Sequence, residues 1–320
     1  MLTVLQTALE VGLIYGLVAL ALFISFSILN IADLSTDGCF TLGCAVGAML
    51  TIAGHPILAL FAAMAAGMLS GYVTAFLQTR LGVESILAGI ISNTGLYTIN
   101  LAVMGFSSNV SITGVDTVFS LFKGLVGGQW SRLILLALIA AVIVIVLIRF
   151  FGTSLGLSIR ATGDSLDMVS ASSINPKATI TIGLCLANAL TALSGCLIGE
   201  YNKFCDINLG TGMVTIALAS LIIGEVFAGH RGGVGKRIVC VVLGSIVYRF
   251  IIALALRLNI SAEYFKLVSA VIVAVAIAAP NMKGYVRLAK IKSNARKLRA
   301  LSGNCLLYTS PSPRDLSTSR

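Results

Sequence analysis

Two ionisable residues lie inside long apolar stretches of this 320-residue chain. Glu225 follows Ile222, Ile223 and Gly224, and Arg249 lies within the next apolar stretch. A charge in the hydrocarbon region of a membrane is costly, so such residues usually face the interior of a helical bundle and pair with an opposite charge. We therefore predict a buried ion pair between Glu225 and Arg249. The alternative is that each side chain lies near a helix end and extends to the lipid headgroups.

A second group of polar residues lies at breaks in the apolar stretches, where carboxylates and amides could contact a passing solute. The segment from Asp33 to Gly38 precedes a glycine-rich apolar run, and the segment from Asp206 to Gly212 precedes another. Such pairs of interrupted segments in an inverted repeat indicate a translocation path, although packing and helix capping are alternative roles. The residues predicted to line the path are Asp33, Asp37, Asn93, Asn100, Asn188 and Asn208.

Catalytic and cofactor-binding motifs are missing from the sequence. Two histidines provide no metal-ligand cluster, and no GxSxG or HExxH motif is present. The stretch from Gly232 to Lys236 resembles a phosphate-binding loop, but that motif requires glycine at His230 and serine or threonine at Arg237. We expect no catalytic residue, no metal site and no cofactor bound by this chain.

The composition excludes a water-soluble domain. Hydrophobic residues make up 58% of the chain and charged residues 11%, whereas a soluble domain carries roughly 25% charged residues. Long uninterrupted apolar runs favour membrane-spanning helices over the short alternating strands of a barrel. The predicted fold is an all-α integral membrane protein, a polytopic bundle of about eight or nine transmembrane helices with an inverted repeat.

Basic residues predict the orientation of the bundle. Arg80, residues 149–177, the loop near Lys236 and the basic stretch after residue 282 fall on one side, which we expect to be the cytoplasm. The same count assigns Asp33 and Asp37 to the cytoplasmic side and residues 106–131 to an outer polar loop. The predicted spans are 4–29, 38–53, 57–78, 84–105, 132–150, 178–199, 212–229, 234–256 and 265–280, the second of which could be re-entrant.

Residues 156–176 form the longest polar interruption between two spanning runs. Asp164 could cap a short helix, Leu166 and Val169 would share one of its faces, and Asn175-Pro176 would begin the next long helix. A short helix in a polar loop suggests a docking element, and an ordinary solvated loop is the alternative. A membrane bundle without a nucleotide site is either the membrane half of an ATP-driven pump or a stand-alone secondary transporter or channel.

Several motifs resemble the permeases of bacterial ABC importers of the branched-chain amino-acid and ribose group, in particular an uncharacterised subgroup linked to tryptophan or tyrosine uptake. The likeness extends over about residues 1–295. One position departs from it, because an arginine is expected where the chain has Ser27. The motifs are Ile28-Leu29-Asn30-Ile31-Ala32-Asp33-Leu34, Asp37-Gly38, Leu87-Ala88-Gly89-Ile90, Leu96-Tyr97-Thr98-Ile99-Asn100-Leu101, Met104-Gly105, Leu157-Ser158-Ile159-Arg160-Ala161-Thr162-Gly163, Ala192-Leu193-Ser194-Gly195 and Ile223-Gly224-Glu225-Val226.

The resemblance implies the ABC importer permease fold and import of an amino acid, aromatic or branched-chain, across the bacterial cytoplasmic membrane by alternating access. It implies three kinds of partner: ABC ATPase subunits that bind ATP and Mg²⁺, a second permease copy, and an extracytoplasmic substrate-binding lipoprotein. A coupling helix within residues 157–176 would contact the ATPase. Its expected residues are Arg160, Ala161, Gly163, Asp164, Leu166, Met168 and Val169.

The C-terminal part divides into two expected segments after the permease domain of residues 1–295. Residues 296–304 continue a basic stretch that we expect to lie in the cytoplasm against anionic membrane lipid, which explains the net charge of +10 without nucleic-acid binding. Residues 305–320 are rich in Ser, Thr and Pro, and we expect them to be disordered or a non-native, adapter-like extension.

Overall fold

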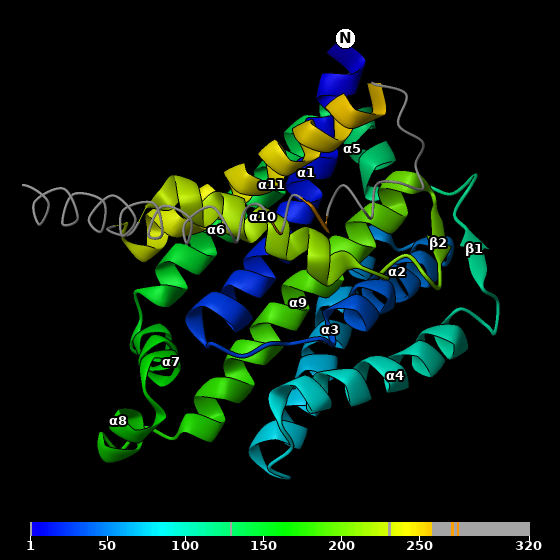
Figure 1. The fold of residues 1–320 in the computed structure, drawn as a ribbon. Helices are drawn as coiled ribbons and strands as arrows, with labels where there is room; N and C mark the ends of the chain where they lie inside the picture. Colours follow the sequence, from blue (N-terminus) through cyan, green and yellow to red (C-terminus); the bar gives the residue numbers. More distant parts are fainter. Residues whose placement is uncertain (1, 129, 230–231, 258–269, 272–273, 275–320) are drawn as a thin grey trace, which may run out of the picture. The chain divides into compact units, whose positions relative to one another are not determined.

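The computed structural model describes residues 2–128, 130–229, 232–257, 270–271 and 274. The described residues up to Arg257 form a helical bundle (Figure 1). Six helices are long and apolar enough to cross a membrane, and two shorter apolar helices accompany them in this part of the chain. The predicted polytopic helical membrane fold is confirmed. The predicted span 265–280 and the segments 296–304 and 305–320 lie outside the described residues.

The first half begins with α1 (Leu2–Leu22), which continues without interruption as a π-helical segment, η1 (Phe23–Ile28). A short connection then turns the chain back into the bundle before the next helix. The helices that follow are α2 (Thr36–Ile52), α3 (Pro56–Thr79) and α4 (Ser85–Val103).

The second half contains both short connecting elements and long helices. Asn175 caps the longest helix, α9 (Pro176–Asn202), by accepting from the Lys177 N–H at 3.0 Å, as expected from the Asn-Pro pair. The order is β1 (Asn109–Ser111), α5 (Val118–Val126), α6 (Ser131–Phe151), α7 (Ser154–Asp164), α8 (Leu166–Ala171), α9, β2 (Phe204–Asp206), α10 (Met213–Ala228) and α11 (Val234–Arg257).

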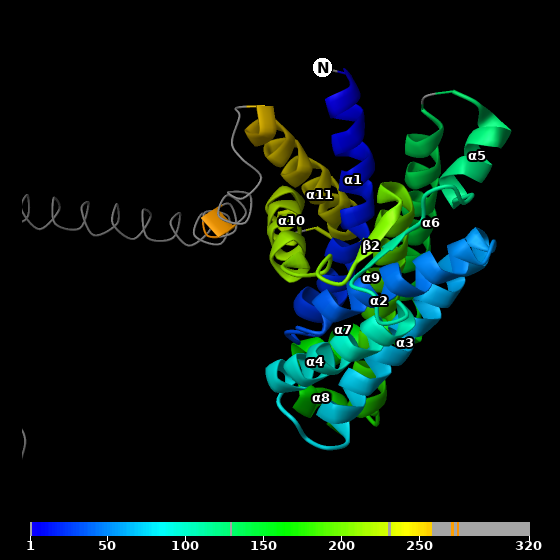
Figure 2. The same cartoon turned by 90° about the vertical axis from the view of Figure 1, so that its right-hand side faces the viewer.

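The polar loop predicted at residues 106–131 contains structure that the all-α expectation omitted. Strand β1 pairs antiparallel with β2, with Asn109 opposite Asp206 and Ser111 opposite Phe204. Thr117 then caps α5 through a capping box with Ser120. Because the 21-residue helix α6 runs from α5 to α7, α5 and α8 lie at opposite ends of the bundle, as both views show (Figures 1 and 2). We call these the α5 end and the α8 end.

Helix α9 forms the centre of the bundle and packs against α1, α2 and α3. Close approach of α2 and α9 depends on glycine at both contacts, because a side chain at Gly43 would collide with the Ala192 carbonyl and one at Gly195 with the Phe40 carbonyl. Membrane helices commonly use small residues in this way, because van der Waals packing replaces the hydrophobic effect as the driving force.

Candidate functional site

The first residues of α2 and α10 meet at the carboxylate of Asp37. Its Oδ2 accepts from the Gly212 N–H at 3.0 Å, and its Oδ1 accepts from the Val214 N–H at 2.9 Å. The Gly210 N–H donates to Thr41 Oγ1 at 3.1 Å beside it. The first N–H groups of a helix have no partner within the helix, and a carboxylate there also complements the helix dipole. Asp37 of one interrupted segment therefore caps the helix that follows the other.

Asp33 lies on the other side of the same helix start. It is buried, its Oδ1 accepts from both the backbone N–H and the hydroxyl of Ser35, and its Oδ2 accepts from Asn188 Nδ2 at 2.8 Å. Asn188 lies about halfway along the 27-residue helix α9. The prediction that Asp33 lies on the cytoplasmic side is therefore wrong, because the chain after η1 turns back into the middle of the bundle.

Two amides of α4, Asn93 and Asn100, complete this group, which we call the α2 cluster: Asp33, Asp37, Asn93, Asn100 and Asn188. Asn100 is buried and donates to the Gly38 carbonyl at 3.0 Å, while Asn93 Oδ1 lies against the Cα of Gly38 so closely that a side chain there would collide with it. Asn208 is not part of the cluster. It is exposed, and its N–H donates to Asp206 in its own loop.

The α2 cluster can form hydrogen bonds and hold helix ends, but it contains no nucleophile beside a base. The part of the chain that the structure describes also holds no group of three His, Cys, Asp or Glu residues suited to a metal ion. Two amide oxygens, Asn100 Oδ1 and Asn188 Oδ1, are buried without a hydrogen-bond partner. Burial of an unpartnered acceptor costs free energy, so these oxygens are candidates for transient contact with a polar solute.

The expected coupling region is two helices and not one. Asp164 ends α7, and Ser165 caps α8 by accepting from the Met168 N–H, so the predicted capping role of Asp164 is wrong. The predicted shared face of Leu166 and Val169 is also wrong, since the first is 53% exposed and the second is buried. Short helices such as α7 and α8 present one side to the bundle and the other to its surroundings. The exposed residues are Arg160 and Asp164 on α7 and Leu166 and Met168 on α8.

Gly163 has a packing role within this region. The last turn of α7 lies directly on the backbone of η1, and a side chain at Gly163 would collide with the Ile28 carbonyl. Ala161 is half-buried on the same helix. Gly163 therefore connects the exposed α7 and α8 to η1 at the end of α1. The ATPase contact that the resemblance implies for Gly163 stays a prediction.

We predict that Gly163→Ala destabilises the protein, because α7 must move away from η1 to admit a methyl group. Such overpacking costs about 1–3 kcal/mol, which is measured as a lower midpoint of thermal unfolding in detergent. Gly152→Ala is the matched control, because a side chain at Gly152 finds ordinary van der Waals distances. Equal midpoints for both variants would contradict the packing role.

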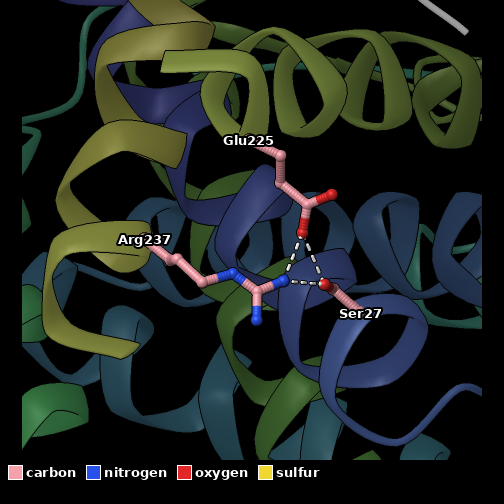
Figure 3. Close-up of polar contacts among 3 residues, drawn as sticks. All are labelled: Ser27, Glu225 and Arg237. Atoms are coloured by element: carbon pink, nitrogen blue, oxygen red, sulfur yellow. Dashed lines mark hydrogen bonds and ion pairs between the residues drawn. The ribbon is translucent and has the colours of Figure 1, made fainter. Parts of the chain in front are cut away.

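Glu225 forms an ion pair with a residue that the sequence did not suggest (Figure 3). Arg237 Nη2 lies 2.6 Å from Glu225 Oε1, and the Ser27 hydroxyl, 2.5 Å from the same oxygen, also accepts from Arg237. Arg237 further covers the Phe23 ring at 5.1 Å. We call Ser27, Glu225 and Arg237 the η1 cluster. It joins η1 to both α10 and α11 at the α8 end, and it brings a guanidinium to the position where the resemblance expects an arginine.

The predicted Glu225–Arg249 pair is wrong because the two residues lie at different levels. Glu225 is in the last turn of α10 and Arg237 in the first turn of α11, whereas Arg249 lies roughly three turns further along α11. The Arg249 guanidinium instead stacks on Tyr15, 3.7 Å from the ring centre. An aromatic face is an accepted partner for arginine in a largely apolar environment.

One buried carboxylate at the α5 end was also missed. Glu200 in the last turn of α9 accepts from the Val118 N–H at 2.8 Å and from Thr51 Oγ1 at 3.1 Å. It therefore links α9 to α5 and α2. An acidic residue at the end of a long apolar run was the available signal for this contact.

Comparison with known proteins agrees with the helical architecture. A family model described as "Branched-chain amino acid transport system / permease component" matches residues 4–277. The chain is 32% identical over 272 residues to a tyrosine transport system permease protein of Clostridioides difficile (strain R20291), covering 85% of this chain and 89% of that protein. It is 31% identical over 277 residues to an uncharacterised protein of Rickettsia prowazekii (strain Madrid E), covering 86% and 96%.

No solved structure matches the chain. The family match nevertheless spans every helix from α1 to α11, including the α2 cluster, α7, α8 and the η1 cluster. Membrane-spanning helices, the family match and the tyrosine transport relative agree on a non-enzymatic translocation subunit. The chain is a multi-pass membrane protein of the ABC transport permease family, of the branched-chain amino acid type.

Proposed function

We propose that this permease imports an amino acid, aromatic or branched-chain, across the bacterial cytoplasmic membrane by alternating access. ATP with Mg²⁺ is hydrolysed on partner ATPase subunits, which the permease contacts through α7 and α8. A second permease copy and an extracytoplasmic substrate-binding lipoprotein complete the assembly. The name of the Clostridioides difficile relative supports tyrosine as the first substrate to test.

The observation that carries the proposal is the exposed surface of α7 and α8 at the end of the bundle. Met168 is 70% exposed and Leu166 53%, and the charged side chains of Arg160 and Asp164 flank them. Large apolar side chains on a short helix outside the spanning segments are typical of an interaction site. Lys177, Arg149, Lys236 and Arg237 lie at the same end, which supports a cytoplasmic position for it.

A continuous set of contacts leads from this surface toward the α2 cluster. Gly163 of α7 rests on Ile28 of η1, and the connection after η1 leads within a few residues to Asp33. A displacement of α7 by the ATPase therefore acts on the segment that positions Asp33 and Asp37. The unpartnered oxygens of Asn100 and Asn188 in that cluster support a polar path beside it.

The test replaces both exposed apolar residues by Leu166→Asp with Met168→Asp. We expect the double variant to fold, with an unchanged thermal midpoint, but to lose co-purification with the co-expressed partner ATPase and to lose tyrosine uptake in proteoliposomes. The control is Leu121→Asp, because Leu121 is 42% exposed on α5 at the opposite end. Retained ATPase binding in the double variant would reject this surface. Gradient-driven uptake without any ATPase would favour a stand-alone transporter.

A further inference from the structure

A cavity of about 330 Å³ lies at the α8 end between the C-terminal end of α3 and the first turns of α9. Helices α3 and α9 pack along each other, and the cavity lies at one end of this contact. Arg80 and Thr79 line it from α3, and Lys177 and Thr181 line it from α9.

The two cations are the charged groups of this cavity. Arg80 and Lys177 are exposed, and neither forms an ion pair with a described residue. The two threonine hydroxyls are already used, because Thr79 donates to the Ala75 carbonyl and Thr181 to the Lys177 carbonyl. Among the described residues, no acidic side chain lines the cavity. A ligand of this cavity must therefore supply negative charge.

The cavity continues into an apolar surface along α3. Phe76 and Tyr72 line the cavity and are 42% and 52% exposed, and Val73 and Leu69 extend the same face with 52% and 68% exposure. Spacings of three and four residues keep these side chains on one side of a helix. The ligand site thus has a cationic end at the helix termini and an apolar stripe directed into the membrane.

We propose that this cavity binds the phosphate headgroup of an anionic phospholipid, with Arg80 and Lys177 against the phosphate and the acyl chains along Leu69, Tyr72, Val73 and Phe76. Basic pockets between membrane helices at the cytoplasmic side bind anionic headgroups for the same reasons. A soluble phosphate would use the cations alone and leave the stripe uncovered. A carboxylate of a partner ATPase would do the same, since such a partner does not reach along a membrane-spanning helix.

The position of Lys177 allows a bound lipid to restrain the neighbouring helix α8. It lies in the first turn of α9, just after Asn175 and Pro176, which connect α8 to α9. A lipid that holds Lys177 against Arg80 fixes the base of α8 relative to α3. The lipid would therefore hold in place the helix pair that is exposed at this end.

The test measures lipid binding to the full-length purified permease by native mass spectrometry, with phosphatidylglycerol and phosphatidylcholine of the same acyl chains. We expect the wild type to retain phosphatidylglycerol preferentially. Arg80→Gln with Lys177→Gln should weaken phosphatidylglycerol binding by about 10- to 30-fold and leave phosphatidylcholine binding unchanged. Each basic residue near an anionic lipid raises the binding constant by a factor of about five, and two such factors multiply. Lys123→Gln with Lys203→Gln, two exposed cations at the α5 end, is the matched control and should keep the preference.

Three results would overturn the proposal. The first is an unchanged preference in a double variant with wild-type thermal midpoint. The second is displacement of phosphatidylglycerol by millimolar inorganic phosphate, which would make the cavity a site for soluble anions. The third is a double variant that keeps its lipid preference but loses the co-purified ATPase, which would assign the cations to that partner.

Discussion

Replacing Asp37 with alanine is expected to destabilise the permease and to stop most of its transport. The substitution removes the acceptor of two backbone N–H groups, those of Gly212 and Val214, at the start of α10. Two N–H groups that lose a charged acceptor and stay without a partner lower the free energy of unfolding by about 2–4 kcal/mol. Because Asp37 belongs to α2 and the donors precede and begin α10, the loss also uncouples two helices that start at the same point.

Replacing Asp37 with asparagine tests whether both acceptor oxygens are needed or whether any polar side chain of this size suffices. Asp37→Asn keeps one oxygen but places an NH₂ group opposite the second N–H, so one donor faces another. We expect an intermediate thermal midpoint in detergent and reduced uptake. Asp206→Asn is the matched control, since Asp206 accepts a single N–H, that of Asn208, within its own loop at 2.7 Å. An Asp37→Asn variant as stable as Asp206→Asn would show that the α10 cap is dispensable.

The spanning helices were predictable because hydrocarbon requires every backbone group to be satisfied within the segment, which leaves a long apolar run as the signature. Helices α2 and α10 illustrate the limit of that rule. Their apolar runs were found, but hydropathy does not show that both helices begin inside the bundle. That position follows from Asn188 and Gly212, which bind Asp33 and Asp37 from distant parts of the sequence.

The sequence predicted which polar residues lie near one another better than it predicted what each of them does. Composition identified carboxylates and amides at breaks in apolar runs, and all of them except Asn208 lie near the start of α2. Their mutual bonds could not be predicted, because side-chain direction depends on the rotation of each helix about its axis. In the coupling region the same limit applies, since exposed Met168 and buried Val169 are neighbours in sequence.

The ion-pair prediction chose the wrong arginine of α11. The predicted span 234–256 begins where α11 begins and contains both Arg237 and Arg249, but Arg237 was counted with the basic loop near Lys236 and was not considered as a partner. In its first turn, Arg237 reaches back across the α10–α11 connection to Glu225. Arg249 lies within a spanning helix, as predicted, but about three turns of α11 beyond the position that faces Glu225. A short connection between two antiparallel helices was the signal that favoured Arg237.

Separate replacement of Glu225 and Arg237 by glutamine is expected to harm transport as much as replacement of both. Each single variant leaves one charge in a half-buried position, with side chains 35% and 31% exposed, and also removes a bond to Ser27. The double variant removes both charges together. Contacting charges in such a network show a coupling free energy of about 0.5–3 kcal/mol. The sum of the stability losses of the two single variants should therefore exceed the stability loss of the double variant.

The location of the η1 cluster predicts which activity is lost. Ser27 is adjacent to Ile28, the residue on which Gly163 of α7 rests, so the cluster holds the far side of the contact between α7 and η1. We expect the single variants to bind the ATPase and to permit ATP hydrolysis, but with less tyrosine transported per ATP than in the wild type. Loss of the cluster frees η1 from α10 and α11, so a displacement of α7 moves η1 without moving those helices.

Lys236→Gln provides the matched control for these single and double variants of Glu225 and Arg237. Lys236 precedes Arg237 on α11, is exposed, and forms no ion pair with a described residue. Its replacement removes the same charge from the same helix turn and should leave stability, transport and ATP hydrolysis unchanged. Additive effects of Glu225→Gln and Arg237→Gln on the thermal midpoint would show that the two side chains act independently. A wild-type ratio of transport to hydrolysis in both single variants would show that the η1 cluster stabilises the fold without coupling α7 to the helices behind it.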